Sequence, residues 1–345
     1  MKIPNKANLE EGEKEKESMT KFSYTNKDNN EKLLLSNIDN SSIQNDLNHE
    51  STFPSIPIYN QKISDDKNLY CQIQNITKTT IPLTQRALLS CLRNQTTGKI
   101  LQKVLMECSR ENIEIIVNEL KGTFRDIIKD KNGNYFCSDL FKICNQQQRI
   151  KILKELEKTI SDDCLDEFGN HPIQTLIEFS SSEDEYKLIL NSFNDYRKII
   201  FASSDSFGSF VIQKIIEHIP EKFRTNFNLL FISSIPLISM KKYGVCNAKR
   251  FISCLKTDQL IEKTADIISQ NFIQIATNNF GNFLIQFIFK KWNNTAQGMK
   301  IKQEVLRNFK ILLENKYSFY ICDLFLKNAS NDEKIKILEF YKHNN

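Results

Sequence analysis

The sequence predicts an all-α protein built from repeats, and three observations support this prediction. Seven similar nine-residue segments recur at intervals of 36, 36, 39, 36, 37 and 36 residues. Between them, apolar residues recur at three- and four-residue spacings, as in amphipathic helices. From about residue 81 onward, glycine and proline rarely interrupt this pattern. A period of this length holds a pair of helices, so we expect an α-solenoid in which each repeat packs on its neighbours.

The first 80 residues differ from the rest of the chain. They are rich in Asn, Ser, Lys, Glu and Asp, and residues 33–35 form their only sustained apolar run. Such a segment buries too little apolar surface to offset its chain entropy. We therefore expect residues 1–80 to be a disordered polar tail and residues 81–345 to form the repeat domain.

The net charge of +5 is unevenly divided along the chain. Residues 1–80 carry 10 Lys and 12 acidic residues, and the remainder carries 37 basic and 30 acidic residues. The body is thus mildly basic. This balance is compatible with a phosphate-rich partner, but an ordinary solvated surface would explain it equally well.

The cysteines and the hydropathy of the chain indicate its cellular compartment and whether it binds a metal or spans a membrane. The nine cysteines form no C-x-x-C pair and match no common zinc spacing, so we expect neither a metal nor a cofactor. Their odd number, together with a polar N-terminus that does not resemble a signal peptide, predicts a reducing, cytoplasmic setting. No run of 18 apolar residues occurs, so no membrane span is expected.

The seven repeated segments share a first position and an apolar stripe. They are TGKILQKVL, GNYFCSDLF, GNHPIQTLI, GSFVIQKII, GVCNAKRFI, GNFLIQFIF and YSFYICDLF. Their first residues are Thr97, Gly133, Gly169, Gly208, Gly244, Gly281 and Tyr317. Positions four, five, eight and nine are mostly apolar, as in Val211, Ile212, Ile215 and Ile216. This stripe is expected to face the core.

Positions two, three and six form a small patch that recurs once per repeat, because residues four apart share one helix face. Position two holds Gly98, Asn134, Asn170, Ser209, Val245, Asn282 and Ser318. Position three holds Lys99, Tyr135, His171, Phe210, Cys246, Phe283 and Phe319. Position six holds Gln102, Ser138, Gln174, Gln213, Lys249, Gln286 and Cys322. A periodic ladder of rings is typical of a base-stacking platform, and flanking amides suit the Watson–Crick edge of a base.

The segments GNHPIQTLIE, FGSFVIQKIIE and FGNFLIQF resemble the second helix of Pumilio (PUF) repeats, with their G-N-Y-V-I-Q pattern. The resemblance covers about residues 81–345. It implies a right-handed curved α-solenoid of about seven to eight repeats, each of two to three helices. It also implies that single-stranded RNA runs antiparallel along the concave face. Messenger RNA untranslated regions, control of decay or translation, and decay or translation-repression proteins as partners are further implications.

Several segments depart from that family pattern. Seven segments are found where eight are usual, so an eighth lies upstream of Thr97 or the count is seven. No segment combines Ser at position two with Glu at position six, which is the family's guanine-reading pair. The fifth segment has Val245, Cys246 and Lys249, which cannot read a base edge in the usual way. Lys249 then holds a phosphate, or the repeat is skipped.

Enzymatic chemistry has little support in the sequence. His171 has no spaced metal or catalytic partner, and no Walker, Rossmann or H-E-x-x-H motif occurs. Asp139 and Asp323 lie too many repeats apart to act as paired carboxylates. A protein-binding solenoid would explain the repeats but not the recurring patch. A nucleolar Pumilio-like protein acting in ribosomal RNA maturation would keep the fold but tends to be strongly basic and to lack the amides.

We therefore expect a monomeric, non-enzymatic protein that selects U-rich single-stranded sites in messenger RNA. The resemblance assigns uridine to Asn170 with Gln174 and to Asn282 with Gln286, in the third and sixth segments. Guanine is not expected to be required at any position.

Overall fold

The computed structural model describes residues 84–332, 334, 335 and 337. Within this part of the chain, all regular structure is helical and no strand occurs. The expected disordered tail, residues 1–80, lies outside the described residues. The prediction of an all-α repeat protein is confirmed.

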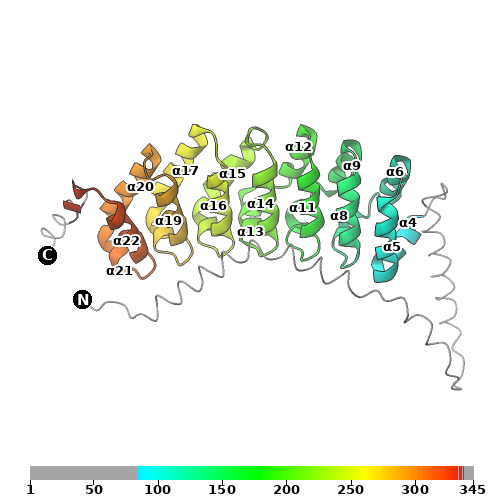
Figure 1. Cartoon of the computed structure of the whole chain (residues 1–345), viewed down its shortest axis with the longest axis horizontal. Helices are drawn as coiled ribbons and strands as arrows, with labels where there is room; N and C mark the ends of the chain where they lie inside the picture. The colour runs from blue at the N-terminus through cyan, green and yellow to red at the C-terminus, as the bar shows by residue number, and fades with distance from the viewer. Residues whose placement is uncertain (1–83, 333, 336, 338–345) are drawn as a thin grey trace, which may run out of the picture. The chain divides into compact units, whose positions relative to one another are not determined.

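One helix from each repeat lies in a continuous row, and we call these the row helices. Each contacts the next one along the chain, and Figure 1 shows them side by side in a gently bent row. Seven row helices occur in the described part of the chain. They are α5 (Gln95–Met106), α8 (Gly133–Ile143), α11 (Asn170–Phe179), α14 (Gly208–His218), α16 (Gly244–Cys254), α19 (Asn282–Lys291) and α22 (Phe319–Asn328).

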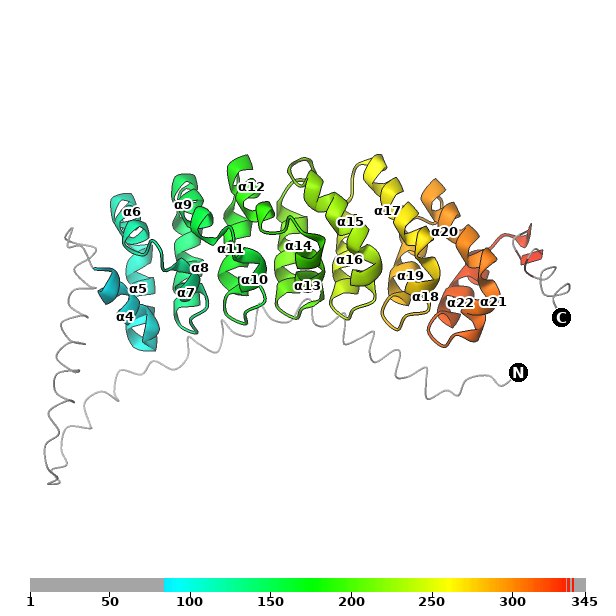
Figure 2. The same cartoon turned by 180° about the vertical axis from the view of Figure 1, so that it is seen from behind.

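Two further sets of helices cover the row helices. The longer set is α6 (Arg110–Glu119), α9 (Gln146–Leu156), α12 (Glu183–Asn191), α15 (Thr225–Ser239), α17 (Asp258–Gln270) and α20 (Ala296–Arg307). The shorter set, labelled in the reverse view of Figure 2, is α4 (Gln85–Arg93), α7 (Phe124–Ile128), α10 (Ile160–Asp163), α13 (Tyr196–Ser204), α18 (Phe272–Ala276) and α21 (Phe309–Glu314). A 3₁₀ turn, η1 (Glu221–Phe223), precedes α15. Most repeats thus have three helices. Between α14 and α16, the single helix α15 takes the place of one longer and one shorter helix.

The apolar stripe of each row helix forms the core, as its spacing predicts. In α14, Val211, Ile212, Ile215 and Ile216 are all buried, and the equivalent residues of α19 are buried too. Since these side chains meet those of the adjacent repeats, the core runs continuously along the row.

The recurring glycine is required by a close approach of two backbone segments. A Cβ atom on Gly169 would lie 2.7 Å from the carbonyl oxygen of Asp163, six residues earlier. The first repeat has Thr97 at this position, and its hydroxyl donates a 2.8 Å hydrogen bond to the carbonyl of Cys91, again six residues earlier. A small residue is therefore needed where each row helix begins, either without a Cβ or with a hydroxyl that bonds the carbonyl.

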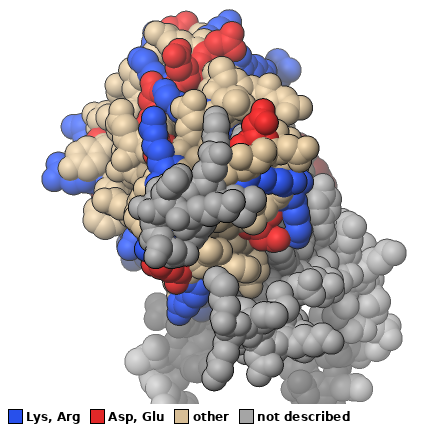
Figure 3. Space-filling view, turned by 90° about the vertical axis from the view of Figure 1, so that its left-hand side faces the viewer, with Lys and Arg blue, Asp and Glu red and all other residues tan. Residues whose placement is uncertain are grey.

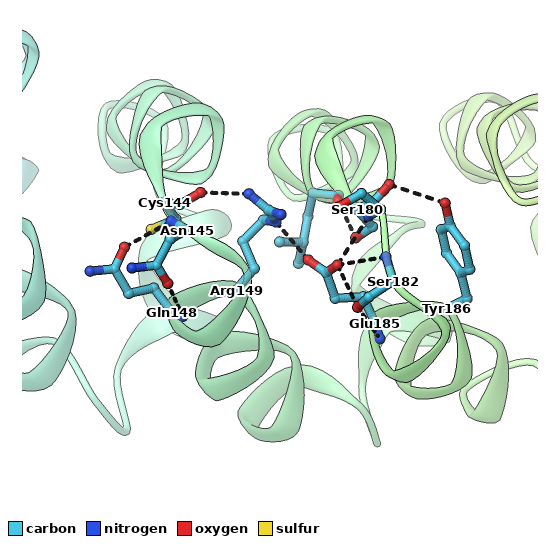
Figure 4. A network of polar contacts seen from close by, with 10 residues as sticks. Cys144, Asn145, Gln148, Arg149, Ser180, Ser182, Glu185 and Tyr186 are labelled. Carbon is cyan, nitrogen blue, oxygen red and sulfur yellow. Dashed lines mark hydrogen bonds and ion pairs between the residues drawn. The ribbon is translucent and has the colours of Figure 1, made fainter.

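A buried ion pair links the second repeat to the third (Figure 4). Arg149 Nε on α9 donates to Glu185 Oε1 on α12 at 2.6 Å, and the Arg149 guanidinium also donates to the carbonyl of Cys144. Glu185 is fully buried and its other oxygen accepts from the backbone N–H groups of Ser181 and Ser182. Burial alone would raise the pKa of Glu185, but these hydrogen bonds and Arg149 lower it.

No single helix among the described residues is long and apolar enough to cross a bilayer. The pair α13 and α14 passes that test together by length and composition, but it is bent by 113° at its break. In the same part of the chain, no group of three His, Cys, Asp or Glu side chains is arranged to hold a metal ion.

Candidate nucleic-acid interface

The rings at position three project from successive row helices. Tyr135 on α8 is 64% exposed and Phe210 on α14 is 50% exposed. His171 on α11 is also exposed, whereas Phe283 on α19 is half-buried. Tyr135, His171 and Phe210 lie outside the core, whereas Phe283 packs partly against it. Partial desolvation lowers the pKa of His171.

The asparagines at position two are buried, which differs from the expectation that they present an open amide. Asn170 Nδ2 donates to the carbonyls of Asp166 (3.0 Å) and Glu167 (2.9 Å). Asn134 and Asn282 make the same pair of bonds. The amide lies at the start of its helix, next to the loop carbonyls that need donors. These asparagines are therefore anchors whose N–H groups are already used.

The glutamines at position six lie directly above these anchors. Gln174 Nε2 donates to Asn170 Oδ1 at 2.9 Å, and Gln286 Nε2 donates to Asn282 Oδ1 at 2.8 Å. Each glutamine is partly exposed. Because the asparagine fixes the glutamine amide, one N–H and the Oε1 atom of each glutamine remain for a ligand. The expected amide pairs thus exist in the third and sixth repeats, with the glutamine as the exposed member.

The remaining position-two and position-six residues are more varied. In the first repeat, Gly98 is buried, Lys99 is exposed and Gln102 is partly exposed. In the second repeat, the hydroxyl of Ser138 donates to the carbonyl of Asn134. In the fourth, Ser209 is buried and bonds the carbonyl of Ser206, while Gln213 is partly exposed. Only the third and sixth repeats present the full amide pair.

The seventh segment is displaced by one residue from its predicted alignment. Asn315 accepts hydrogen bonds from the N–H groups of Tyr317 and Ser318, as Asn278 does from Phe280 and Gly281 before α19. Ser318, rather than Tyr317, therefore occupies position one.

The corrected alignment changes the candidate residues of the seventh repeat. Cys322 is core rather than surface: it is 1% exposed, and burial raises the pKa of its thiol to about 12. Position two is Phe319, which is 42% exposed, and position three is Tyr320. Position six is Asp323, so this repeat carries a carboxylate there after all. The 37-residue interval from Gly281 to Ser318 and the hydroxyl of Ser318 were the available sequence signals.

Charged side chains of neighbouring repeats pair with one another along the row. Figure 3 looks at the end that carries α22, where basic and acidic side chains alternate with neutral surface. Along the row, Lys214 pairs with Glu178 at 3.0 Å, and Arg250 pairs with Glu217 at 3.0 Å. These two basic side chains are thus each neutralised by a carboxylate of a neighbouring repeat.

The sequence and the fold are both similar to those of known repeat proteins. The sequence matches the Pumilio-family RNA binding repeat over residues 100–121, 124–157, 164–191, 203–226 and 271–305. Pumilio homolog 12 of Arabidopsis thaliana is 23% identical over 245 residues, and the alignment covers 70% of this chain and 40% of that protein. Pumilio homolog 11 of the same plant is 24% identical over 68% of this chain and 42% of its own. The chain thus spans less than half the length of these relatives.

Solved structures share the fold. A Puf4 RNA binding domain bound to the HO endonuclease RNA 3′ UTR recognition sequence superimposes with a TM-score of 0.65. It is 22% identical, and the match covers 72% of this chain and 78% of that domain. The RNA-binding domain of yeast Puf5p, bound to AAT2 RNA, gives a TM-score of 0.65 at 20% identity, with 76% and 75% covered.

Proposed function

The chain belongs to the Pumilio family of repeat proteins, and on this premise we propose that it binds single-stranded RNA selectively, without a catalytic step. The observation that carries the proposal is the series of rings at position three, exposed in the second, third and fourth repeats, together with the fixed amides at position six of the third and sixth repeats. Neighbouring row helices lie roughly 8–10 Å apart, so an extended strand can place one base between successive rings.

Two repeats are proposed to select uridine. Gln174 and Gln286 each retain an acceptor oxygen and one N–H, and asparagine fixes the orientation of the amide. Uracil offers an N3–H group flanked by carbonyl oxygens, so it can satisfy both atoms of such an amide. The ring at position three, His171 or Phe283, provides the adjoining stacking surface. We infer a U-rich site with uridines facing the third and sixth repeats.

The proposed biological targets are 3′ untranslated regions of messenger RNA. The support is that the Puf4 neighbour is bound to such a sequence. On this proposal the protein acts in the cytoplasm on messenger stability or translation, together with decay or translation-repression proteins. A less selective role in ribosomal RNA maturation remains the second candidate, and equal binding of all sequences would favour it.

The direct test is binding of the full chain to fluorescein-labelled decauridine, measured by anisotropy. The matched competitors are decacytidine and a duplex of decauridine with decaadenosine. We expect decauridine to compete best and the duplex to compete weakly, because the bases of a duplex cannot enter between the rings. Equal competition by the duplex would contradict the proposal.

A further inference from the structure

The fifth repeat keeps its place in the row but lacks the recurring patch. Its helix α16 contacts α14 on one side and α19 on the other. Residues 227–270, which include all of α16, are nevertheless not matched by the family repeat. This repeat therefore preserves the solenoid while its surface has diverged.

Neither position two nor position three of α16 can recognise a base. Val245 is 1% exposed and has no polar side-chain atom. Cys246 is exposed but carries no ring on which a base could stack. In α19 the same positions hold Asn282 and Phe283. The fifth repeat thus lacks both the amide anchor and the stacking surface.

Lys249, at position six of α16, reaches toward the next repeat. Its Nζ atom lies 5.5 Å from the centroid of the Phe283 ring, which holds position three of α19. The negative face of the ring attracts the ammonium group and keeps it on the row. Burial lowers the pKa of Lys249. The charge of Cys246 raises this pKa and the positive charge of Lys290 on α19 lowers it.

Within the part of the chain that the structure describes, Lys249 forms no ion pair, and no carboxylate is among the charged groups that shift its pKa. A partly buried cation is costly without a partner, so an anion that docks here gains from both Lys249 and Lys290. The ammonium group donates in three directions and accepts nothing, so it can bond only acceptor atoms. It suits the oxygens of a phosphate.

We propose that Lys249 binds a backbone phosphate of the RNA and that the nucleotide facing the fifth repeat is not read. This inference rests on the proposed RNA binding. It assigns the fifth repeat a positioning role between the fourth and sixth repeats. Because a phosphate contact carries no sequence information, the bound site should tolerate any base at this one place.

The experiment compares Lys249→Met, Lys249→Arg and a matched control, Lys310→Met, which removes an exposed charge from the short helix α21. Affinity for fluorescein-labelled decauridine is measured from about 50 to 200 mM salt. Each phosphate contact on a single strand contributes roughly 0.7 to the slope of log affinity against log salt. Over this range the wild type should therefore lose about 2.6-fold more affinity than Lys249→Met. Lys249→Arg and Lys310→Met should follow the wild type.

A second measurement separates a phosphate contact from base reading. Selections from random RNA with wild type and Lys249→Met should enrich the same motif, with one unconstrained nucleotide beside the uridine that faces the sixth repeat. A changed base preference with an unchanged salt slope would overturn the proposal, and so would no change in either. An unchanged slope, with inorganic phosphate raising the melting temperature of the wild type alone, would assign the site to free phosphate and also overturn it. If the wild type does not bind decauridine at all, the proposed function itself fails.

Discussion

The hydroxyl of Ser318 donates a 2.8 Å hydrogen bond to the carbonyl of Leu312, six residues earlier in the chain. Thr97 makes the same bond to Cys91 in the first repeat. In the repeats between them, a glycine lets the backbone approach the equivalent carbonyl. This shared geometry fixes position one of all seven repeats. It places Cys322 in the core and Asp323 on the surface that carries the rings and amides.

Two neighbouring substitutions test this alignment. Cys322→Ala should lower the free energy of unfolding by about 1 kcal/mol, because it leaves a small cavity, and should leave RNA affinity unchanged. Asp323→Ala should leave stability within about 0.5 kcal/mol of wild type. It should abolish any base preference at the end of the RNA that faces the seventh repeat, since a carboxylate selects bases that offer N–H donors. Denaturant melts and a panel of four end-substituted RNAs measure both effects. If Cys322→Ala instead changed the base preference and Asp323→Ala destabilised the fold, Tyr317 would be position one.

Replacing Tyr135 and Phe210 together with Ala should weaken binding of single-stranded RNA but leave thermal stability nearly unchanged. Both rings are half or more exposed and lie outside the core. Each lost stack should cost about 1–3 kcal/mol of binding free energy. The matched control is Phe201→Ala, which removes a ring that is 67% exposed on the short helix α13. Equal loss of affinity in the control, or unfolding of the double variant, would show that the ladder is not the binding surface.

The sequence predicted the fold well because the solenoid depends on features that repeat. The interval of about 36 residues, the glycine and the apolar stripe each appear several times, so single exceptions such as Thr97 did not obscure them. The site was less predictable because it depends on hydrogen bonds to loop carbonyls. Periodicity alone could not show that Asn170 is an anchor or that Lys249 rests on a ring of the next repeat. The predicted alignment of the seventh segment was wrong because Ser318 stands where five of the other repeats have the glycine that marks position one.

The buried pair Arg149–Glu185 should contribute strongly to stability. Glu185→Gln leaves the buried guanidinium without its carboxylate and should cost about 3 kcal/mol at pH 7. The folded-state pKa of Glu185 is lowered, so its contribution is present above the unfolded value of about 4.3 and is lost as pH falls through the folded value. The difference in the free energy of unfolding between wild type and Glu185→Gln should therefore be constant above about pH 5 and become smaller below about pH 4.

Denaturant melts at several pH values measure this difference. Glu183→Gln is the control, because Glu183 lies on the same helix but its carboxylate is exposed. The control should behave like wild type throughout. A difference for Glu185→Gln that increases toward low pH would contradict the role assigned to the pair.

The sixth repeat offers a test of base selection. Changing Asn282 to Ser and Gln286 to Glu should move the preference at one position from uridine to guanosine, because glutamate accepts from the N1–H and N2–H groups of guanine. Ser209 already occupies position two of the fourth repeat and bonds a loop carbonyl, so serine is compatible with this site. By analogy with bidentate readout on DNA, the change in preference should amount to about 1–3 kcal/mol of binding free energy. Binding of RNAs that differ only at this nucleotide measures it, and an unchanged uridine preference would contradict the role of Gln286.

The most direct test of selective RNA binding is a selection of the full wild-type chain against random single-stranded RNA. The structure predicts an enriched motif with two uridines three nucleotides apart, facing Gln174 and Gln286. It further predicts that guanine, if it is selected at all, occurs only at the end facing Asp323. A motif with an obligatory guanine elsewhere and no uridines would contradict the account, as would equal enrichment of all sequences.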